Sequence, residues 1–304
     1  MRMRTARLPL LLVLALAACG DDGRPEAAPS DSTVARGAAV ADDPAVRGRD
    51  IDRRIFEEKM ELARAERLDT LPIGSIMVRI GESFLGTKYT PSTLEVEPER
   101  LVTNLEELDC VTFVENVLAM ARIVRASTPT WDAYVRELER IRYRGGELNG
   151  YPSRLHYFSE WIADNARLGL VRNVTRDLGG VPHTEAIDFM TTHRESYRQL
   201  ADTAVLAQIR QQEERLSGTE RFWIPEDALP GVMRRLENGD VIAATSSIDG
   251  LDIAHTGIAV VRPDGVYLMH APLVGENVQM SETTIAERIA RIEGQDGIMV
   301  ARPL

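Results

Sequence analysis

Apolar residues recur at helical spacing along much of the chain. The clearest run has members at i, i+3, i+4, i+7, i+8 and i+11, which form one continuous stripe: Cys110, Phe113, Val114, Val117, Leu118 and Ala121. Asp109 precedes the stripe as a natural N-cap, so the pattern predicts a helix with Cys110 in its first turn. Further helices are predicted over residues 50–68, 71–86, 131–144, 157–165 and 195–216.

The last quarter of the chain has a different pattern. Four short runs rich in β-branched residues follow one another: GDVIAA, HTGIAVV, GVYLMHA and GIMVAR. The turn signal RPDG separates the second run from the third, which predicts a β-hairpin. Helices followed by strands indicate an α+β domain with an antiparallel sheet, on which the Cys110 helix is expected to pack.

The amino terminus has the features of an export signal. Three arginines precede an apolar run from Leu8 to Ala18, which is too short for a stable membrane span. The sequence LAAC around Cys19 resembles a bacterial lipobox, in which the cysteine is lipidated; an ordinary signal peptide with an incidental cysteine is the alternative. Residues 20–50 are rich in Gly, Ala, Pro, Ser and Asp and predict a disordered tether.

These features predict three parts: a signal peptide over residues 1–19, the tether, and a folded domain over residues 51–304. A large, mostly helical insertion is expected at about residues 126–236. The expected location is the bacterial cell envelope, facing the periplasm, with the outer membrane as one option. The net charge of −11, with no basic stripe, argues against a nucleic-acid partner.

Cys110 is the second of only two cysteines. If Cys19 is acylated, Cys110 has no disulfide partner, yet it persists in an exported protein. A helix amino terminus favours the thiolate, and Asp109 as an N-cap would direct its carboxylate at backbone N–H groups and not at the sulfur. Cys110 could be a nucleophile or, as the plainer alternative, a buried core thiol.

A nucleophilic thiol needs a base, and two histidines lie in the strand-like runs. If the hairpin turn sets Val261 opposite Val266, then Gly257 faces His270, and His255 lies diagonally from His270 on the same face. This predicts Cys110 as nucleophile, His255 as base and His270 as the residue that orients the base. Half of a zinc site is the alternative for the two histidines, but neither H-x-x-x-H nor C-x-x-C occurs.

The motifs GTKY, LDCVTFVENV, NGDVIA, HTGIAVV and YLMHA resemble, in order, those of the NlpC-type papain-like cysteine peptidases. The segment NGYPSRLHYFSEWI resembles the N-acetylmuramoyl-L-alanine amidase-like branch of that superfamily. The resemblance covers about residues 73–304. It implies a papain-like fold, a peptidoglycan or muropeptide substrate, and no metal or organic cofactor.

The resemblance also implies roles for individual residues. Cys110, His255 and His270 match the catalytic set, Tyr89 matches a tyrosine that faces the active site, and Asp109 matches an aspartate that helps hold a substrate amine. Val111 departs from the small serine usual after the nucleophile. Residues in the segment from Ser153 to Trp161 are expected to shape the pocket, with these as candidate substrate contacts: Ser153, Arg154 and His156.

The predicted function is hydrolysis of an envelope amide, foremost the bond between N-acetylmuramic acid and L-alanine. Two alternatives remain open at this stage. One is a related enzyme with another bond, such as a γ-D-glutamyl endopeptidase or a cysteine acyltransferase. The other is a lipoprotein that binds muropeptides without chemistry.

Overall fold

The computed structural model describes residues 49–125, 129–273 and 277–304. The predicted signal peptide, the lipobox Cys19 and most of the tether therefore lie outside the described residues. The helices are α2 (Asp50–Ala65), α3 (Ile73–Glu82), α4 (Cys110–Val124), α5 (Trp131–Arg142), α6 (Phe158–Arg167), α7 (Phe189–Thr192), α8 (Thr203–Ser217), α9 (Leu229–Val232) and α10 (Ile285–Ile289). Short 3-10 turns are η1 (Leu68–Thr70), η2 (Arg144–Gly146), η3 (Tyr151–Ser153), η4 (Arg194–Ser196), η5 (Arg198–Ala201), η6 (Glu226–Ala228) and η7 (Met233–Arg235).

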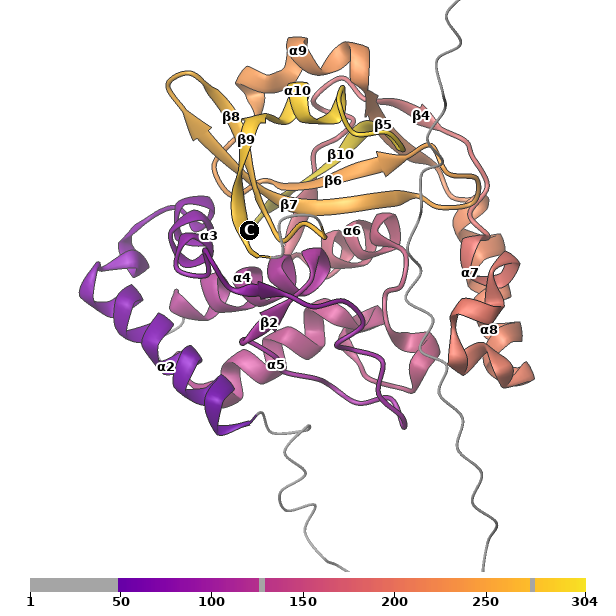
Figure 1. The fold of residues 1–304 in the computed structure, drawn as a ribbon, viewed down its shortest axis with the longest axis horizontal. Coiled ribbons are helices and arrows are strands. Elements are labelled where there is room, and N and C mark those ends of the chain that lie inside the picture. The colour runs from indigo at the N-terminus through magenta and orange to yellow at the C-terminus, as the bar shows by residue number, and fades with distance from the viewer. Residues whose placement is uncertain (1–48, 126–128, 274–276) are drawn as a thin grey trace, which may run out of the picture. The chain divides into compact units, whose positions relative to one another are not determined.

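An eight-stranded antiparallel sheet forms the other half of the described domain (Figure 1). Its strands are β3 (Val171–Asn173), β4 (Val181–His183), β5 (Arg221–Pro225), β6 (Val241–Ser246), β7 (Ile253–Arg262), β8 (Gly265–His270), β9 (Gln279–Thr284) and β10 (Gln295–Pro303). The order is β4-β5-β10-β6-β7-β8-β9, with β3 also paired to β10. The prediction of a mixed α and β domain with an antiparallel sheet is thus confirmed.

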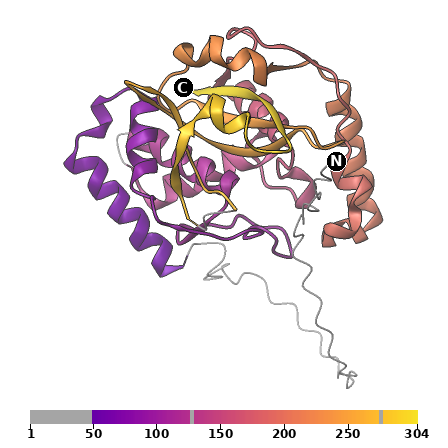
Figure 2. The ribbon, with the colours of Figure 1, turned by 45° about the horizontal axis from the view of Figure 1, so that its top comes forward.

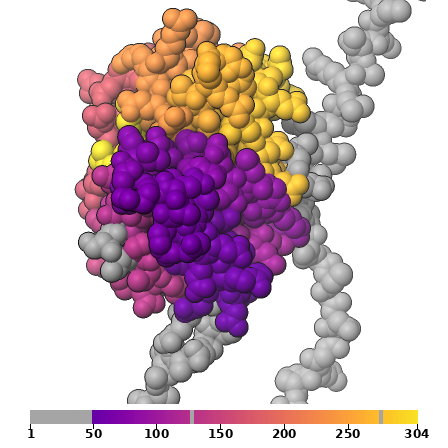
Figure 3. All heavy atoms as spheres, turned by 90° about the vertical axis from the view of Figure 1, so that its left-hand side faces the viewer, coloured from indigo at the N-terminus to yellow at the C-terminus, as the bar shows by residue number. Residues whose placement is uncertain are grey.

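The sheet separates two apolar layers. Residues such as Val241, Ile258 and Met269 face α4, whereas the alternate positions, such as Ile242 and Leu268, pack with α9 and α10. Figures 1 and 2 show α4 and α6 on one side of the sheet and the orange and yellow α9 and α10 on the other. In Figure 3 the indigo atoms of the first helices, α2 and α3, cover the middle of the face, below the orange and yellow atoms of later segments.

Helix α4 is more central than its apolar stripe predicted. Its side chains from Thr112 to Ala121 are all buried, including those of Glu115 and Asn116. This occurs because α3, α5 and β7 all pack against it. The predicted N-cap is confirmed: the Thr112 backbone N–H donates to Asp109 Oδ1 at 2.7 Å.

The predicted hairpin register is also confirmed, since Val261 pairs with Val266 and the ladder continues to Ile258 opposite Met269. A bulge lies just before the first histidine, because Ala244 pairs with His255 whereas the next residue of β6 pairs with Ile253. Bulges re-aim side chains and are common beside active sites. Here the irregularity sets the position of His255 at the end of the regular ladder.

The central insertion contains short strands in addition to the predicted helices. Residues 131–235 contain the expected helices, with a helix capped by Thr130 and ended near Gly145 and Gly146, whose φ angles are +71° and +82°. They also contribute β3, β4 and β5, which extend the sheet beyond β10. These strands are short and lack clear period-2 alternation, so the sequence pattern did not reveal them. Within the described residues, no helix is both long and apolar enough to span a membrane.

Candidate active site

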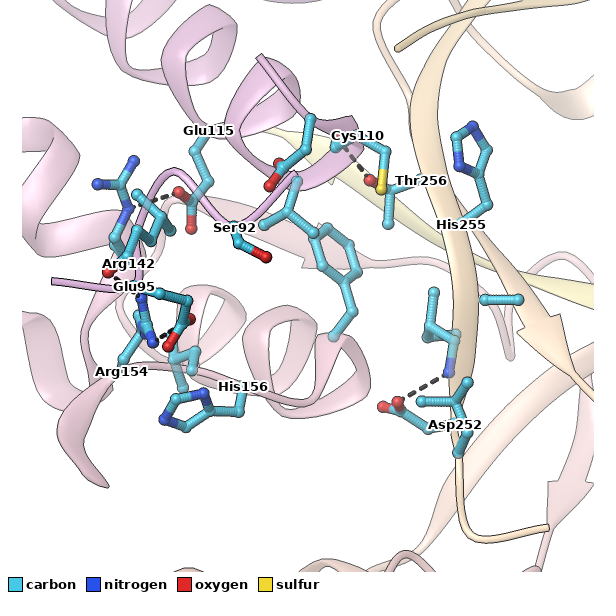
Figure 4. A pocket seen from close by; sticks show the side chains of 18 residues that line it. Ser92, Glu95, Cys110, Glu115, Arg142, Arg154, His156, Asp252, His255 and Thr256 are labelled. Carbon is cyan, nitrogen blue, oxygen red and sulfur yellow. Dashed lines mark hydrogen bonds and ion pairs between the residues drawn. The ribbon is translucent and has the colours of Figure 1, made fainter. Parts of the chain in front are cut away.

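A cavity of about 290 Å³ lies where the amino terminus of α4 meets the start of β7 (Figure 4). The α4 side contributes Asp109, Cys110 and Glu115, and β7 contributes His255 and Thr256. Figure 4 shows the insertion residues Arg154 and His156 across the cavity from His255 and Thr256. A third wall comes from residues 90–106, here termed the strap, which has no helix or strand and joins β1 (Lys88–Tyr89) to β2 (Glu107–Leu108).

Cys110 occupies the first position of α4 and keeps part of its surface exposed. The Thr256 hydroxyl donates to the Cys110 backbone carbonyl at 2.8 Å, which ties the helix end to β7. Hydrogen bonds from Thr256 and from the Val111 backbone favour the thiolate, although less strongly than burial disfavours it. Cys110 is therefore held between a helix end and a strand.

The helix amino terminus favours the thiolate, but it does not decide the pKa of Cys110. Burial and the negative charge of Asp109 outweigh the helix end and raise the pKa of the thiol to about 11. Asp109 does cap α4, as expected, but its carboxylate is still close enough to oppose a second negative charge. At neutral pH the Cys110 side chain is therefore a thiol, which could act as a nucleophile only with a partner that accepts its proton.

This raised pKa makes a direct prediction about alkylation. Only the thiolate reacts, so the rate of Cys110 alkylation by iodoacetamide should rise about tenfold per pH unit from pH 7 to 10 without levelling off. Peptide mapping by mass spectrometry would measure modification at Cys110 alone. In urea, where burial and Asp109 no longer act, the rate should level near the ordinary thiol pKa. A plateau below pH 8 in the folded protein would contradict the raised pKa.

His255 and His270 form a hydrogen-bonded pair, as the hairpin register predicted. His255 Nε2 lies 2.7 Å from His270 Nδ1, and the rings meet edge to face with centroids 4.9 Å apart. Both rings are buried, and burial is the main cause that lowers the pKa of His255 well below its usual value and that of His270 to about 3. The positive charge of Arg288 in α10 acts in the same direction. Both rings are therefore neutral at pH 7.

The pair defines which nitrogen of His255 can accept a proton. If His255 Nε2–H donates to His270 Nδ1, then His255 Nδ1 keeps a free lone pair. No hydrogen bond joins this ring to the Cys110 thiol within the described residues, although both side chains line the same cavity. Catalytic hydrogen bonds are often long before a substrate binds, so this arrangement suits a resting enzyme.

Tyr89 and Asp109 lie close to Cys110. Tyr89 pairs with Leu108 in the parallel β1–β2 bridge, directly before the α4 cap. Burial, followed by the negative charges of Cys110 and Asp109, raises the pKa of Tyr89, so its phenol stays protonated and can donate a hydrogen bond. Asp109 lines the cavity itself. Both residues are near enough to Cys110 to interact electrostatically with it, but only Asp109 belongs to the cavity lining.

The three candidate contacts in the insertion are placed differently from one another. His156 lines the cavity, with Nε2 on the Tyr151 carbonyl at 2.9 Å, and burial lowers its pKa, so the neutral ring keeps Nδ1 as an acceptor. Arg154 also lines the cavity, but its guanidinium is engaged by the strap. Ser153 does not belong to the cavity lining; its hydroxyl bonds the backbone of Asn149 and Gly150 within its own turn. The hydroxyl of Ser153 therefore holds the turn.

Comparison with known proteins identifies the fold and its family. The family model described as N-acetylmuramoyl-L-alanine amidase-like matches residues 79–297. The chain belongs to the N-acetylmuramoyl-L-alanine amidase-like family. A crystal structure of an N-acetylmuramoyl-L-alanine amidase from Bacteroides uniformis is 34% identical, with a TM-score of 0.73, over 76% of this chain and 98% of that one.

Two further structures are similar to this amidase-like protein. A candidate xylanase from Bacteroides fragilis is 37% identical with a TM-score of 0.68, over 73% of this chain and 98% of the other. A Legionella pneumophila protein, 18% identical with a TM-score of 0.63 over 84% of this chain and 96% of its own, shares the fold. Among curated proteins, none matches the sequence.

The amidase-like cavity also contains charged residues that sequence analysis missed. Glu115 lies five residues after Cys110 on α4, and its carboxylate accepts from Arg142 Nε at 2.7 Å, with each side chain only 2% exposed. Such a pair is costly to bury, and it stands on the cavity wall opposite β7 (Figure 4). The only sequence signal for this ion pair was the presence of a charged residue, Glu115, among the apolar residues of the helix.

Asp252 is a second residue that sequence analysis missed. It is buried at the foot of β7 and accepts the Ser159 backbone N–H at 2.7 Å, in the first turn of α6. A carboxylate at this end of a helix is stabilised by the helix dipole. Asp252 thereby ties the insertion to the strand that carries His255. In the described parts of the chain, no cluster of three or more His, Cys, Asp or Glu side chains is arranged to hold a metal ion.

Proposed function

We propose that this member of the amidase-like family is a cysteine-dependent hydrolase that cuts the amide between N-acetylmuramic acid and L-alanine in peptidoglycan or its fragments. One observation carries the proposal: a thiol at a helix amino terminus shares a cavity with the neutral His255, whose ring is hydrogen-bonded to the buried His270. The similarity to a Bacteroides uniformis amidase supports the choice of bond. The order of nucleophile helix and histidine strands supports an NlpC-type, papain-like assignment.

The first half of the proposed reaction forms an acyl-enzyme. As the Cys110 sulfur attacks the amide carbon, its proton passes to His255 Nδ1, and the carbonyl oxygen becomes an oxyanion. The Cys110 backbone N–H stands in the first turn of α4, where no helical carbonyl can accept it, and is therefore available to that oxyanion. The His255 imidazolium then gives its proton to the leaving amine of L-alanine, and the C–N bond breaks.

The second half releases the sugar acid. A water molecule enters, His255 accepts one of its protons, and the oxygen attacks the thioester carbon. The C–S bond breaks, and the sulfur recovers its proton from His255. His270 keeps its hydrogen bond to His255 Nε2 throughout and so preserves the orientation of the base. The side chains of Tyr89, Asp109 and His156 are the proposed donors and acceptors for substrate, and the reaction needs no metal or organic cofactor.

We also propose that the enzyme is anchored to the cell envelope through a lipid on Cys19 and faces the periplasm. The charged start, the apolar run and the LAAC sequence support this, and residues 20–48 provide the link to the catalytic domain. The mass of the mature amino-terminal peptide tests the anchor, since an unmodified Cys19 or a cleavage elsewhere would refute it.

Soluble muropeptides of defined structure test the reaction. The full-length protein should release free stem peptide, with L-alanine at its new amino terminus, and the protein alkylated beforehand at pH 9 should release none. Mass spectrometry would identify the bond. Cleavage between γ-D-glutamate and the third residue would favour an endopeptidase, and transfer of the acyl group to an added amine would favour an acyltransferase. Binding without any product, unchanged by alkylation, would favour a binding protein.

A further inference from the structure

The strap forms one wall of the cavity although it has no regular secondary structure. Ser92, Leu94 and Glu95 line the cavity from this segment. Both ends of the strap adjoin the nucleophile, because Tyr89 and Leu108 pair in the β1–β2 bridge immediately before Asp109. Ser92 has a φ of +61°, which is unfavourable for a residue with a side chain. A segment of this kind keeps one shape only if other contacts hold it.

Arg154 supplies the most extensive of these contacts. Its Nη1 donates to the Leu94 carbonyl at 2.8 Å, its Nη2 donates to Glu95 at 2.6 Å, and its Nε lies 3.8 Å from Glu99. All three guanidinium nitrogens thus face partners in the strap. The side chain is 6% exposed, and the guanidinium carbon lies 5.0 Å from the centroid of the Tyr151 ring. A buried planar guanidinium with several carboxylate partners is rigidly placed.

Neighbouring residues continue the same clamp. The Tyr143 hydroxyl donates to Glu99 at 2.9 Å and lies 3.1 Å from the Arg100 carbonyl, and Arg142 Nη1 donates to the Val102 carbonyl at 2.6 Å. Glu99 is buried, and burial raises its pKa even though the positive charge of Arg154 opposes this. The positive charge of Arg154 therefore stabilises the ionised form of the buried Glu99 carboxylate.

We propose that Arg154 is a positioning residue, which holds the strap as the wall of the substrate cavity and does not itself bind substrate. Cys110, His255 and His270 are held separately by α4 and the sheet, so loss of Arg154 should widen the cavity without disturbing them. The insertion that carries Arg154 thereby has a role: it shapes the substrate cavity by holding the strap in place. The kinetic part of the test rests on the proposed amidase function.

The test replaces Arg154 with Met, which keeps the apolar stem and removes the guanidinium. We expect KM for the muropeptide substrate to rise about tenfold while kcat stays within about threefold. The cavity wall would bind the substrate and the transition state equally well, so its loss weakens binding without slowing the chemical step. Under native conditions, thermolysin should cut the folded Arg154→Met variant before Leu94 or Val96, and we expect these sites to be protected in the wild type. Arg154→Lys should fall between the two, since a point charge can serve only some of the strap partners.

Arg144→Met is the matched control. Arg144 also pairs with a carboxylate in the insertion, Glu160, at 2.7 Å, and its hydrogen bonds go to Glu160 and Pro152, which belong neither to the strap nor to the cavity lining. It should leave KM and the protease pattern as in the wild type. If Arg154→Met does not fold, Glu95→Gln is the substitute, because it removes the ion pair between Glu95 and Arg154 at a side chain that is 39% exposed. It should raise KM and the cutting of the strap in the same direction, but less.

Two results would overturn the proposal. One is an Arg154→Met protein with unchanged KM and an uncut strap. The other is a fall in kcat with KM and protection unchanged, which would place Arg154 in direct contact with the reacting groups. Proteolysis needs no substrate, so it decides the role of Arg154 in holding the strap even if the wild type cleaves none of the muropeptides. Failure of the amidase proposal is thereby distinguishable from failure of this one.

Discussion

Cys110→Ala should lower kcat for muropeptide hydrolysis by about 10⁴-fold or more, because the acyl-enzyme can no longer form. Among the described residues that line the cavity, Cys110 alone carries sulfur, and the Thr256 hydroxyl on β7 donates to its backbone carbonyl. Removing one small side chain from a partly exposed helix start should leave the fold intact. Product release measured by mass spectrometry and affinity measured by calorimetry would separate chemistry from binding.

The affinity measurement makes the result for Cys110→Ala decisive. We expect the dissociation constant for an uncleaved muropeptide to change by less than about threefold, since the cavity keeps its other walls. A variant that still turns over at the wild-type rate would remove the thiol from the mechanism. A wild type that binds but never cleaves, matched by the variant in every respect, would favour the binding-protein alternative.

The parts of the site that sequence analysis predicted depend on local rules. The stripe from Cys110 to Ala121 and the Asp109 cap are properties of one helix, and the hairpin turn alone sets the register that brings His255 and His270 together. The N-terminus of a helix and the two faces of a hairpin are set by a few neighbouring residues. For these features, the sequence pattern was sufficient.

The parts that it missed depend on packing between distant segments. The Glu115–Arg142 pair spans 27 positions, and Arg154 reaches partners about 60 positions earlier in the chain. The raised pKa of Cys110 has the same origin, since burial, its largest cause, requires the assembled cavity. Helix polarity predicts a lower pKa, but it does not reveal how deeply the sulfur will be enclosed. Strands β3, β4 and β5 are likewise short segments: β3 and β5 pair with β10, far along the chain, and β4 pairs with β5.

His255→Ala should lower kcat by about 10³-fold, because the same ring takes the thiol proton and returns it to the leaving amine. His270 offers a finer test of this assignment. In the tautomer in which His255 Nε2–H is the donor, His270 accepts through Nδ1. The amide oxygen of Asn, Oδ1, is bonded to the corresponding carbon, Cγ, so His270→Asn can keep this hydrogen bond.

The expected order of kcat is therefore wild type, His270→Asn within about tenfold, then His270→Gln and His270→Ala about 10²-fold down, because tautomer and ring orientation are lost. Gln is the matched control, since it carries the same amide one carbon further out, where it no longer meets His255. Circular dichroism and thermal unfolding would show that each variant is folded. If Gln were as active as Asn, or Ala as active as the wild type, the pairing seen between the two rings would not be what orients the base.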